Sequence, residues 1–407
     1  MRSLPDLVNR STMRARAARG MTTLAAVICI VASPGACGGA YPSAGGTHTI
    51  EIDRQVWLGG IEGRPTAITK LSDGGFAIAG HLSTGWVVAT DAQGEIRWKY
   101  VAPLDENLIL PSPAFPHSEF HGLVPLANGN ILLCGQKYTN VHKTVAMITI
   151  LSSTGQLLEE RAEFTNGDED FTTSSIDHCI RWNDGVVLTG SKRNKVGATQ
   201  WMMKLDGNGA NQWQKEFTSD AALFNPAIGA DRSLVAAQIS WNPAQPTANA
   251  IKRLNEKGET IATSAPMKGD YQYILRAVGV DKGVAIIDSY HLSNTYRLYA
   301  LGERLEQTEE PRQLRIINLQ EGFGFRLPDR SLVLFGSTIT QYGGRGAIDW
   351  IAPNGDEMAV VVLRQILNGV TFGDAVPLPN NQFVVVASQN AYASRTHGLF
   401  MSWITLH

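Results

Sequence analysis

The sequence is short of the features that mark several large classes of protein. Charged residues make up only 18% of its 407 residues, with 35 Lys and Arg against 37 Asp and Glu. A general nucleic-acid binder needs a basic excess to displace counterions from phosphates, so this balance argues against one. Low charge together with 40 Gly argues against a coiled coil and against an extended disordered chain. The mean hydropathy of −0.09 argues against a multi-span membrane protein.

The familiar motifs of catalysis are also missing. The sequence has no G-x-S-x-G elbow, no H-E-x-x-H, no P-loop and no G-x-G-x-x-G that opens a helix. It has no Cys-x-x-Cys and no Cys/His spacing typical of a metal site. These absences lead us to expect no metal and no cofactor, and they favour a protein that is not an enzyme.

The first 37 residues have the pattern of an export signal. Arg14, Arg16 and Arg19 precede an apolar run of ten residues, Thr23 to Ala32. A helix needs roughly 20 apolar residues to span a bilayer, whereas a signal-peptide core needs fewer. Gly, Ser and Pro dominate residues 38–47, so we expect a flexible tether there.

The end of this segment, Pro34-Gly35-Ala36-Cys37-Gly38, resembles the bacterial lipobox. The resemblance implies that Cys37 is lipidated and that the protein is periplasmic and anchored to a bacterial membrane. Pro34 stands where the lipobox usually has Leu, so ordinary signal cleavage near Ala36 is the alternative.

Two of the four cysteines fall outside this leader. Cys134 and Cys179 belong to the body of the protein, and an exported protein permits a disulfide between them. The alternative is that both are small buried hydrophobic residues.

The body is a repeat. A tight polar turn between two apolar segments recurs seven times, at Asp73, Asn128, Asp184, Asp231, Asp281, Asp329 and Asn380. The successive steps are 55, 56, 47, 50, 48 and 51 residues. Asx-Gly and Asx-Arg-Ser sequences suit hairpin turns, and the flanks are rich in residues that favour buried strands.

A second turn in most units joins a third strand to a fourth, as in residues 86–100 and 201–217. The fifth unit is degenerate there, at residues 298–307. The seventh unit ends with its third strand at residues 400–407, so we expect residues 48–60 to supply the missing strand. Without it, the last unit would leave an open edge.

These units predict an all-β fold over residues 48–407: a seven-bladed β-propeller of four-stranded antiparallel blades, closed by the N-terminal strand. Residues 91–98 and 206–213 resemble the quinoprotein-type blade motif, an Asp, a Gly and a Trp around the outer hairpin. The turn is one residue shorter than in that family, and the resemblance implies the fold more than a cofactor. A β-sandwich pair or a β-helix is the alternative, although a sandwich would not keep a step of about 50 residues.

Residues six or seven positions before each first turn should lie on innermost strands around a central pore. The polar ones form our candidate ligand site: His121, Asp177, His178, Asn225 and Asp374, with Thr66 in the first unit. His117, Glu119 and His121 lie close in sequence, but we predict no metal there. The alternative is that pore-lining residues are polar because they face water.

The loops after the second strands carry basic and aromatic residues. Those we select as a candidate binding rim are Lys137, Tyr138, Arg193, Trp241, Tyr342, Arg345 and Arg395. Exposed aromatic and Arg side chains on one rim are typical of a protein-binding surface. Scattered loop polarity is the alternative.

The sequence therefore favours a monomeric, non-enzymatic envelope lipoprotein whose propeller binds a protein partner or a ligand. An assembly factor and an immunity or inhibitor protein are two variants of this hypothesis. The alternative is an exported propeller enzyme, a glycan lyase, a hydrolase or a quinoprotein-like oxidoreductase, with its site at the pore.

Overall fold

The structure is a computed structural model, and all of its described strands lie in the unit formed by residues 43–407. It describes residues 48–407 except 106–107, 109–115, 141–142, 165–170, 195–196, 218–221, 230, 240–249, 266–271, 281–282, 291–294, 303, 309–311, 315–319, 328, 330, 341–342, 354–355, 363–369 and 391–396. The predicted signal segment 1–37 with Cys37 and the predicted tether 38–47 lie outside the described residues.

The described residues form 28 strands and no helix, so the protein is all-β. In this part of the chain, the search for a helix long and apolar enough to cross a membrane found none.

Most strands belong to four-stranded antiparallel sheets in which chain neighbours pair. Four of these sheets are β2–β5 (Arg64–Lys70, Phe76–His81, Gly85–Thr90, Ile96–Val101), β14–β17 (Ala222–Ile228, Leu234–Ile239, Ala250–Leu254, Thr260–Thr263), β18–β21 (Gln272–Val280, Gly283–Tyr290, Thr295–Leu301, Arg312–Leu314) and β22–β25 (Gln320–Arg326, Leu332–Thr340, Gly343–Ile351, Glu357–Val362).

The fifth four-stranded sheet joins the two ends of the described chain. Its order is β1-β28-β27-β26, formed by Ile50–Trp57, His397–Leu406, Gln382–Asn390 and Val370–Leu378. β1 runs antiparallel to β28, with Ile50 opposite Leu406 and Trp57 opposite Phe400.

The remaining eight strands form one sheet where the repeat predicted two. It contains β6–β9 (Ser118–Pro125, Ile131–Asn140, Lys143–Leu151, Leu157–Glu163) and β10–β13 (Phe171–Trp182, Gly185–Asn194, Ala198–Leu205, Asn211–Phe217). A single parallel pairing, Thr173 with Thr144, connects the two halves. The start of β10 reaches the neighbouring sheet, where the Ala146 amide donates to Ser174 Oγ at 2.8 Å.

The turns follow the sequence signals closely. At the first turn, the Gly75 amide donates to Asp73 Oδ1 at 3.0 Å, and the Asn130 amide donates to Asn128 Oδ1 at 3.0 Å. At the outer turn of β4–β5, the amides of Gln93 and Glu95 both donate to Asp91 Oδ1 at 2.8 Å. Asx side chains thus replace backbone partners at the tips of the hairpins.

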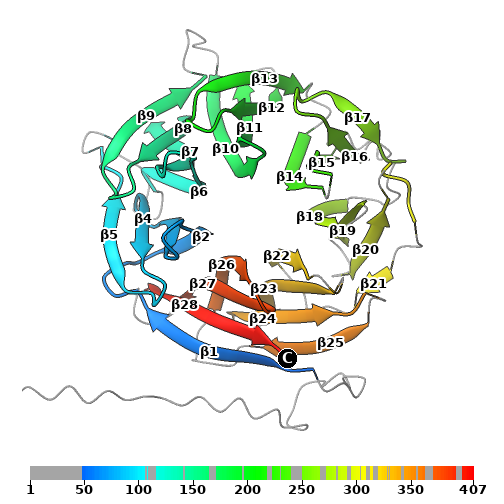
Figure 1. Cartoon of the computed structure of the whole chain (residues 1–407). Coiled ribbons are helices and arrows are strands. Elements are labelled where there is room, and N and C mark those ends of the chain that lie inside the picture. The colour runs from blue at the N-terminus through cyan, green and yellow to red at the C-terminus, as the bar shows by residue number, and fades with distance from the viewer. Residues whose placement is uncertain are drawn as a thin grey trace, which may run out of the picture. The chain divides into compact units, whose positions relative to one another are not determined.

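The hydrophobic core lies between neighbouring sheets. One cluster joins β2–β4 to β6–β8 and includes Val87, Phe120 and Leu133, and another joins β26–β28 to β2–β4 and includes Ile78 and Val384. Figure 1 shows why: the sheets stand side by side around a common centre, with first strands innermost and fourth strands outermost. The sheets whose burial the structure describes therefore pack face to face against their neighbours.

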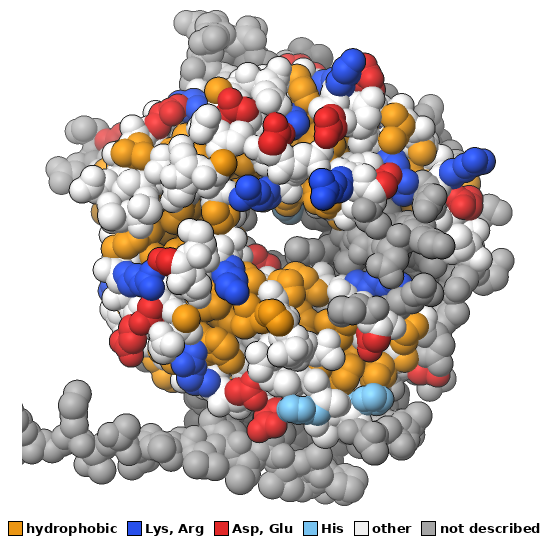
Figure 2. Space-filling view, in the orientation of Figure 1, with side chains coloured by type: hydrophobic (Ala, Val, Ile, Leu, Met, Phe, Trp, Pro, Cys, Tyr) orange, Lys and Arg blue, Asp and Glu red, His pale blue; other side chains and the backbone are white. Residues whose placement is uncertain are grey.

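The first strands also touch one another in series. β2 contacts β6, β6 contacts β10, and the contacts continue through β14, β18 and β22 to β26, which contacts β2. Figure 2 shows an opening near the centre of one face, with Lys and Arg side chains close to it. We call the edge at which first strands begin and second strands end the loop edge, and the opposite edge the turn edge.

Candidate functional site

Backbone bulges on the innermost strands aim the candidate side chains. The pairing register of β2 slips between Pro65 and Ala67, that of β6 between Phe120 and Gly122, and that of β10 between Ile176 and His178. The residues left over at these bulges are Thr66, His121 and Asp177. A bulge re-aims a side chain and recurs beside functional sites, so the predicted positions share one local geometry.

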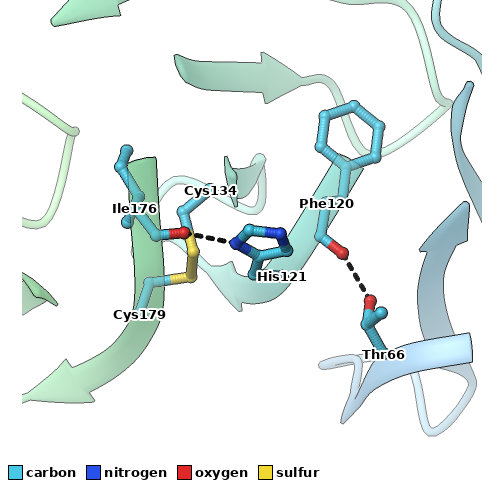
Figure 3. Close-up of a disulfide and its surroundings, with 6 residues drawn as sticks. All are labelled: Thr66, Phe120, His121, Cys134, Ile176 and Cys179. Atoms are coloured by element: carbon cyan, nitrogen blue, oxygen red, sulfur yellow. Dashed lines mark hydrogen bonds between the residues drawn. A yellow bond between two sulfur atoms is a disulfide. The ribbon is translucent and has the colours of Figure 1, made fainter. Parts of the chain in front are cut away.

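Two bulge residues tie neighbouring sheets together (Figure 3). Thr66 Oγ1 donates to the Phe120 carbonyl at 2.5 Å, and His121 Nδ1 lies 2.6 Å from the Ile176 carbonyl. Each acceptor immediately precedes the bulge of the next first strand. His121 therefore occupies in its sheet the structural position that Thr66 occupies in the preceding one.

The other nitrogen of His121 is also engaged. Its Nε2 lies 3.1 Å from Glu119 Oε2, and the two side chains are 22% and 17% exposed. Burial lowers the pKa of His121, but the bonds to Glu119 and to the Ile176 carbonyl and the charge of Asp177 outweigh it and raise the pKa above its ordinary value. Both partners are acceptors, so the protonated ring can donate from both nitrogens, and this favours the cationic form.

Glu119 is the centre of the polar cluster. Burial raises its pKa, yet hydrogen bonds from His121 and from Gln136, the latter at 2.6 Å, hold the pKa below its ordinary value. The carboxylate thus stays ionised in a partly buried place. Both of these hydrogen bonds go to Oε2, and neither engages Oε1.

Asp177 has the opposite tendency. Burial raises its pKa above the ordinary value, although Ser175 Oγ donates to its Oδ1 at 2.7 Å and His121 lowers the pKa. Ser175 Oγ also lies 3.0 Å from Ser191 Oγ. Asp177 is therefore more readily protonated than Glu119, whose pKa is lowered.

The sequence reasoning missed His81 as a site residue. His81 ends β3, burial lowers its pKa, and the charges of Glu119, His121 and Arg64 act on it. Its Nδ1 is buried and has no hydrogen-bond partner among the described residues, and the same holds for His117 Nδ1. A signal was present: His81, Gln136 and Ser191 each follow the Gly near the end of a second strand.

Cys134 and Cys179 form a disulfide beside this cluster (Figure 3), with their Cα atoms 6.3 Å apart. It links β7 to β10 and so joins the two halves of the eight-stranded sheet. Gly122 packs against it, since a Cβ at that position would lie 2.7 Å from Cys179 Sγ. Only glycine leaves room there without a shift.

The other predicted residues are dispersed. His178 is half-buried on β10, and Asp374 Oδ2 accepts from the Ile68 amide at 3.2 Å, which links β26 to β2. Asn225 lies on β14 and Arg345 on β24.

The candidate rim residues are also separate. Lys137 Nζ lies 3.1 Å from Glu160 Oε1, Arg193 is exposed on β11, and burial raises the pKa of Tyr138 on β7. Trp241, Tyr342 and Arg395 lie outside the described residues.

A metal has no evident place in the described part of the chain, where no group of three or more His, Cys, Asp or Glu side chains could hold one.

The outer Trp residues have structural partners: Trp98 Nε1 donates to the Ser153 carbonyl and Trp213 Nε1 to the Glu256 carbonyl, both at 2.9 Å. Arg161 does the same at the Gly209 carbonyl at 2.7 Å. These side chains tie the outermost strands β5, β9 and β13 to the outer turn that follows along the chain.

Comparison with known proteins supports the fold. No protein-family model and no curated protein matches the sequence. The structure is similar to virginiamycin B lyase from Staphylococcus aureus, with a TM-score of 0.51, 11% identity, and 88% of this chain and 99% of that chain covered. It is also similar to puromycin hydrolase, with a TM-score of 0.51 and 14% identity. The latter match covers 82% of this chain and 52% of that chain. At these identities the likeness shows a β-propeller-like, all-β fold.

Proposed function

We propose that this protein is a seven-bladed propeller, closed by β1, which binds a ligand or partner protein at the loop edge of β2–β11. Residues 1–37 would export it, and a lipid on Cys37 would hold it at the periplasmic side of a bacterial membrane. The β1–β28 pairing and the serial contacts of the first strands support closure. The Cys134–Cys179 disulfide supports an oxidising compartment.

The unmet hydrogen-bonding capacity around Glu119 carries the binding proposal. His81 Nδ1 is buried and finds no hydrogen-bond partner within the described part of the chain, and the charge of Glu119 acts on His81. His117 Nδ1, two residues before Glu119 in the sequence, is in the same condition. Buried polar groups almost always have partners, and leaving one without costs about 1–3 kcal/mol. A polar ligand that bonds to these groups would remove this cost.

His121 favours binding over catalysis. A general base needs a nitrogen that can take a proton, whereas both nitrogens of His121 donate to fixed acceptors. The ring tethers two sheets and keeps Glu119 ionised and oriented. Its contribution is to hold the binding groups in place.

Affinity capture tests this proposal. Tagged mature protein is recovered from detergent-solubilised envelope, and retained proteins and small molecules are identified by mass spectrometry. We expect a stoichiometric partner or ligand that is lost in Glu119→Gln and in His81→Ala. Glu259→Gln, an exposed change on an outer turn, is the control. Equal recovery by all variants with unchanged thermal unfolding would contradict the proposed site.

An enzyme is the second candidate, and His81 is the observation that favours it. Burial lowers the pKa of its ring and so favours the neutral form, and Nδ1 has no hydrogen-bond partner among the described residues. A neutral imidazole beside Glu119 is a candidate proton acceptor. The structural likeness to a virginiamycin B lyase and a puromycin hydrolase makes those two antibiotics the first compounds to try. Consumption of either compound by the wild type but not by His81→Ala, followed by mass spectrometry, would establish this alternative.

A further inference from the structure

A separate groove opens at the turn edge, between the sheets of β10–β13 and β14–β17. Its volume is about 1240 Å³. It is lined by Trp182, Asn183, Asp184, Lys204, Gln212, Trp213, Ile228, Asp231, Arg232, Ser233, Asn255, Glu256, Lys257 and Ile261. The Glu119 cluster lies at the loop edge, so this groove is a different surface and its function is independent of the one proposed above.

One part of the lining is apolar. Trp182 is fully buried, and its ring meets that of Trp213 edge-on at 6.4 Å between centroids. Trp213 is half-buried, and Ile261 on β17 is 55% exposed. The groove therefore presents an indole and an aliphatic side chain to whatever occupies it.

The carboxylates of the lining already have partners. Asp184 lies 3.4 Å from Lys204 Nζ, Asp231 lies 3.2 Å from Arg253 Nη1, and Glu256 accepts from Asn183 Nδ2 at 2.7 Å. Lys204 and Arg253 balance the charges of Asp184 and Asp231. Glu256 keeps its negative charge, because its partner is a neutral amide.

Two cations of the lining are not committed. The side chains of Arg232 and Lys257 are exposed and form no ion pair with any described residue. The charge of Lys257 acts only weakly on the exposed Glu259, which bonds to Asn255. The unpaired charges of the groove are therefore the two cations Arg232 and Lys257 and the one carboxylate Glu256, and their sum is positive. A net positive charge suits a carboxylate, which Arg binds with two parallel hydrogen bonds.

We propose that this groove binds an acidic oligosaccharide, one whose sugar rings carry carboxylates. The C–H face of a pyranose packs against Trp213 and Ile261, the exposed Gln212 amide bonds to ring hydroxyls, and Arg232 and Lys257 receive the carboxylates. An acidic peptide would match the charge. It would not offer the apolar ring face that suits the Trp213 indole together with the hydroxyl groups that suit the Gln212 amide.

Calorimetric titration with trigalacturonate tests the proposal. We expect saturable binding that weakens with added salt and disappears for the fully methyl-esterified trimer, which keeps the sugar faces but lacks the charges. The comparison of the two trimers does not depend on any variant folding correctly. Absence of binding by trigalacturonate at millimolar concentration would overturn the proposal, and binding of hexaglutamate alone would replace the saccharide by a peptide.

Paired variants locate the site. Arg232→Asn combined with Lys257→Ala should weaken trigalacturonate binding at least about tenfold. Asn is chosen because Arg232 has a φ of 63°, which Asn tolerates. Lys70→Ala, which removes an exposed cation from β2, is the matched control and should bind as the wild type does. Equal loss in the control would mean that the groove is not the site.

Discussion

His121 shows how one residue can resemble a catalytic group and act as a structural tie. It stands at the bulge of β6 as Thr66 stands at the bulge of β2, and both bond to the carbonyl that precedes the next bulge. The imidazole adds a positive charge, which holds Glu119 ionised. The position and contacts of His121 are therefore explained by its role in holding the fold, without a catalytic role.

This equivalence predicts the behaviour of two variants. His121→Thr should retain the tie to Ile176 and cost less stability than His121→Ala. His121→Ala should lose about 2 kcal/mol near pH 5.5, because it removes hydrogen bonds made by a charged group. Urea unfolding of both variants measures the difference. Equal losses would mean that the tie contributes nothing.

The pH dependence of stability follows from the same pair. The folded-state pKa of His121 is raised, so its contribution is complete below its unfolded value of about 6.5 and is lost as the pH rises through the folded value. The folded pKa of Glu119 is lowered, so its contribution is present above about 4.5 and is lost as the pH falls through the folded value. The melting temperature of the wild type should fall as the pH rises above about 6.5. The melting temperature of His121→Thr should not show this fall. An unchanged profile in the variant would contradict the assignment.

The disulfide gives a further test at the residue scale. Cys134 and Cys179 are 45 residues apart. Closing a loop of that length stabilises a protein by about 4 kcal/mol in the chain-entropy description. Cys134→Ala with Cys179→Ala should lower the melting temperature, and a reductant should lower that of the wild type but not of the variant. A reductant effect that persists in the variant would point to another cause.

At the scale of the elements, side chains on outermost strands donate hydrogen bonds to carbonyls of the next outer turn, as Trp98, Arg161 and Trp213 do. Gly155 and Gly258 allow Trp98 and Trp213 to approach those turns, since a Cβ on either would lie 2.5 or 2.7 Å from the indole. The quinoprotein-like Trp positions are therefore packing positions. They account for the spacing of the motif without any cofactor.

Two glycine substitutions separate this contact from backbone strain. Gly258 and Gly74 have φ values of 68° and 87°, but a Cβ on Gly74 would meet no atom within 4 Å. Both changes to Ala should cost about 1 kcal/mol of left-handed strain. Gly258→Ala should cost about 1–3 kcal/mol more for the clash with Trp213. Denaturant unfolding that finds equal costs would show that the approach is not tight.

At the scale of the whole molecule, the proposed ring depends on its two ends. β1 is the outermost strand of the last sheet, and its loss would expose β28 and the residues it covers. Deletion of residues 48–60 should lower the melting temperature of the whole domain and not only of one sheet. Deletion of residues 38–47, the tether, is the control and should leave it unchanged.

Anchoring is tested separately. Cys37→Ser should move the protein from the membrane fraction to the soluble periplasm, because it removes the sulfur that would carry the lipid. Fractionation followed by immunoblotting measures this change. Membrane retention of the variant would favour attachment through a bound partner.

The sequence by itself determined the strands, the turns and their order, because these depend on local signals: apolar alternation, Asx turns and glycines at left-handed positions. It also indicated that residues 48–60 would pair with the C-terminal strand, and β1 does so. The tertiary structure decided which side chains meet. His81 comes from β3, Glu119 and His121 from β6, and Asp177 from β10, strands of two sheets. The bulge in β10 makes Asp177 rather than His178 the leftover residue. Such choices depend on the packing of sheets that are about 50 residues apart in the chain, and no local pattern records that packing.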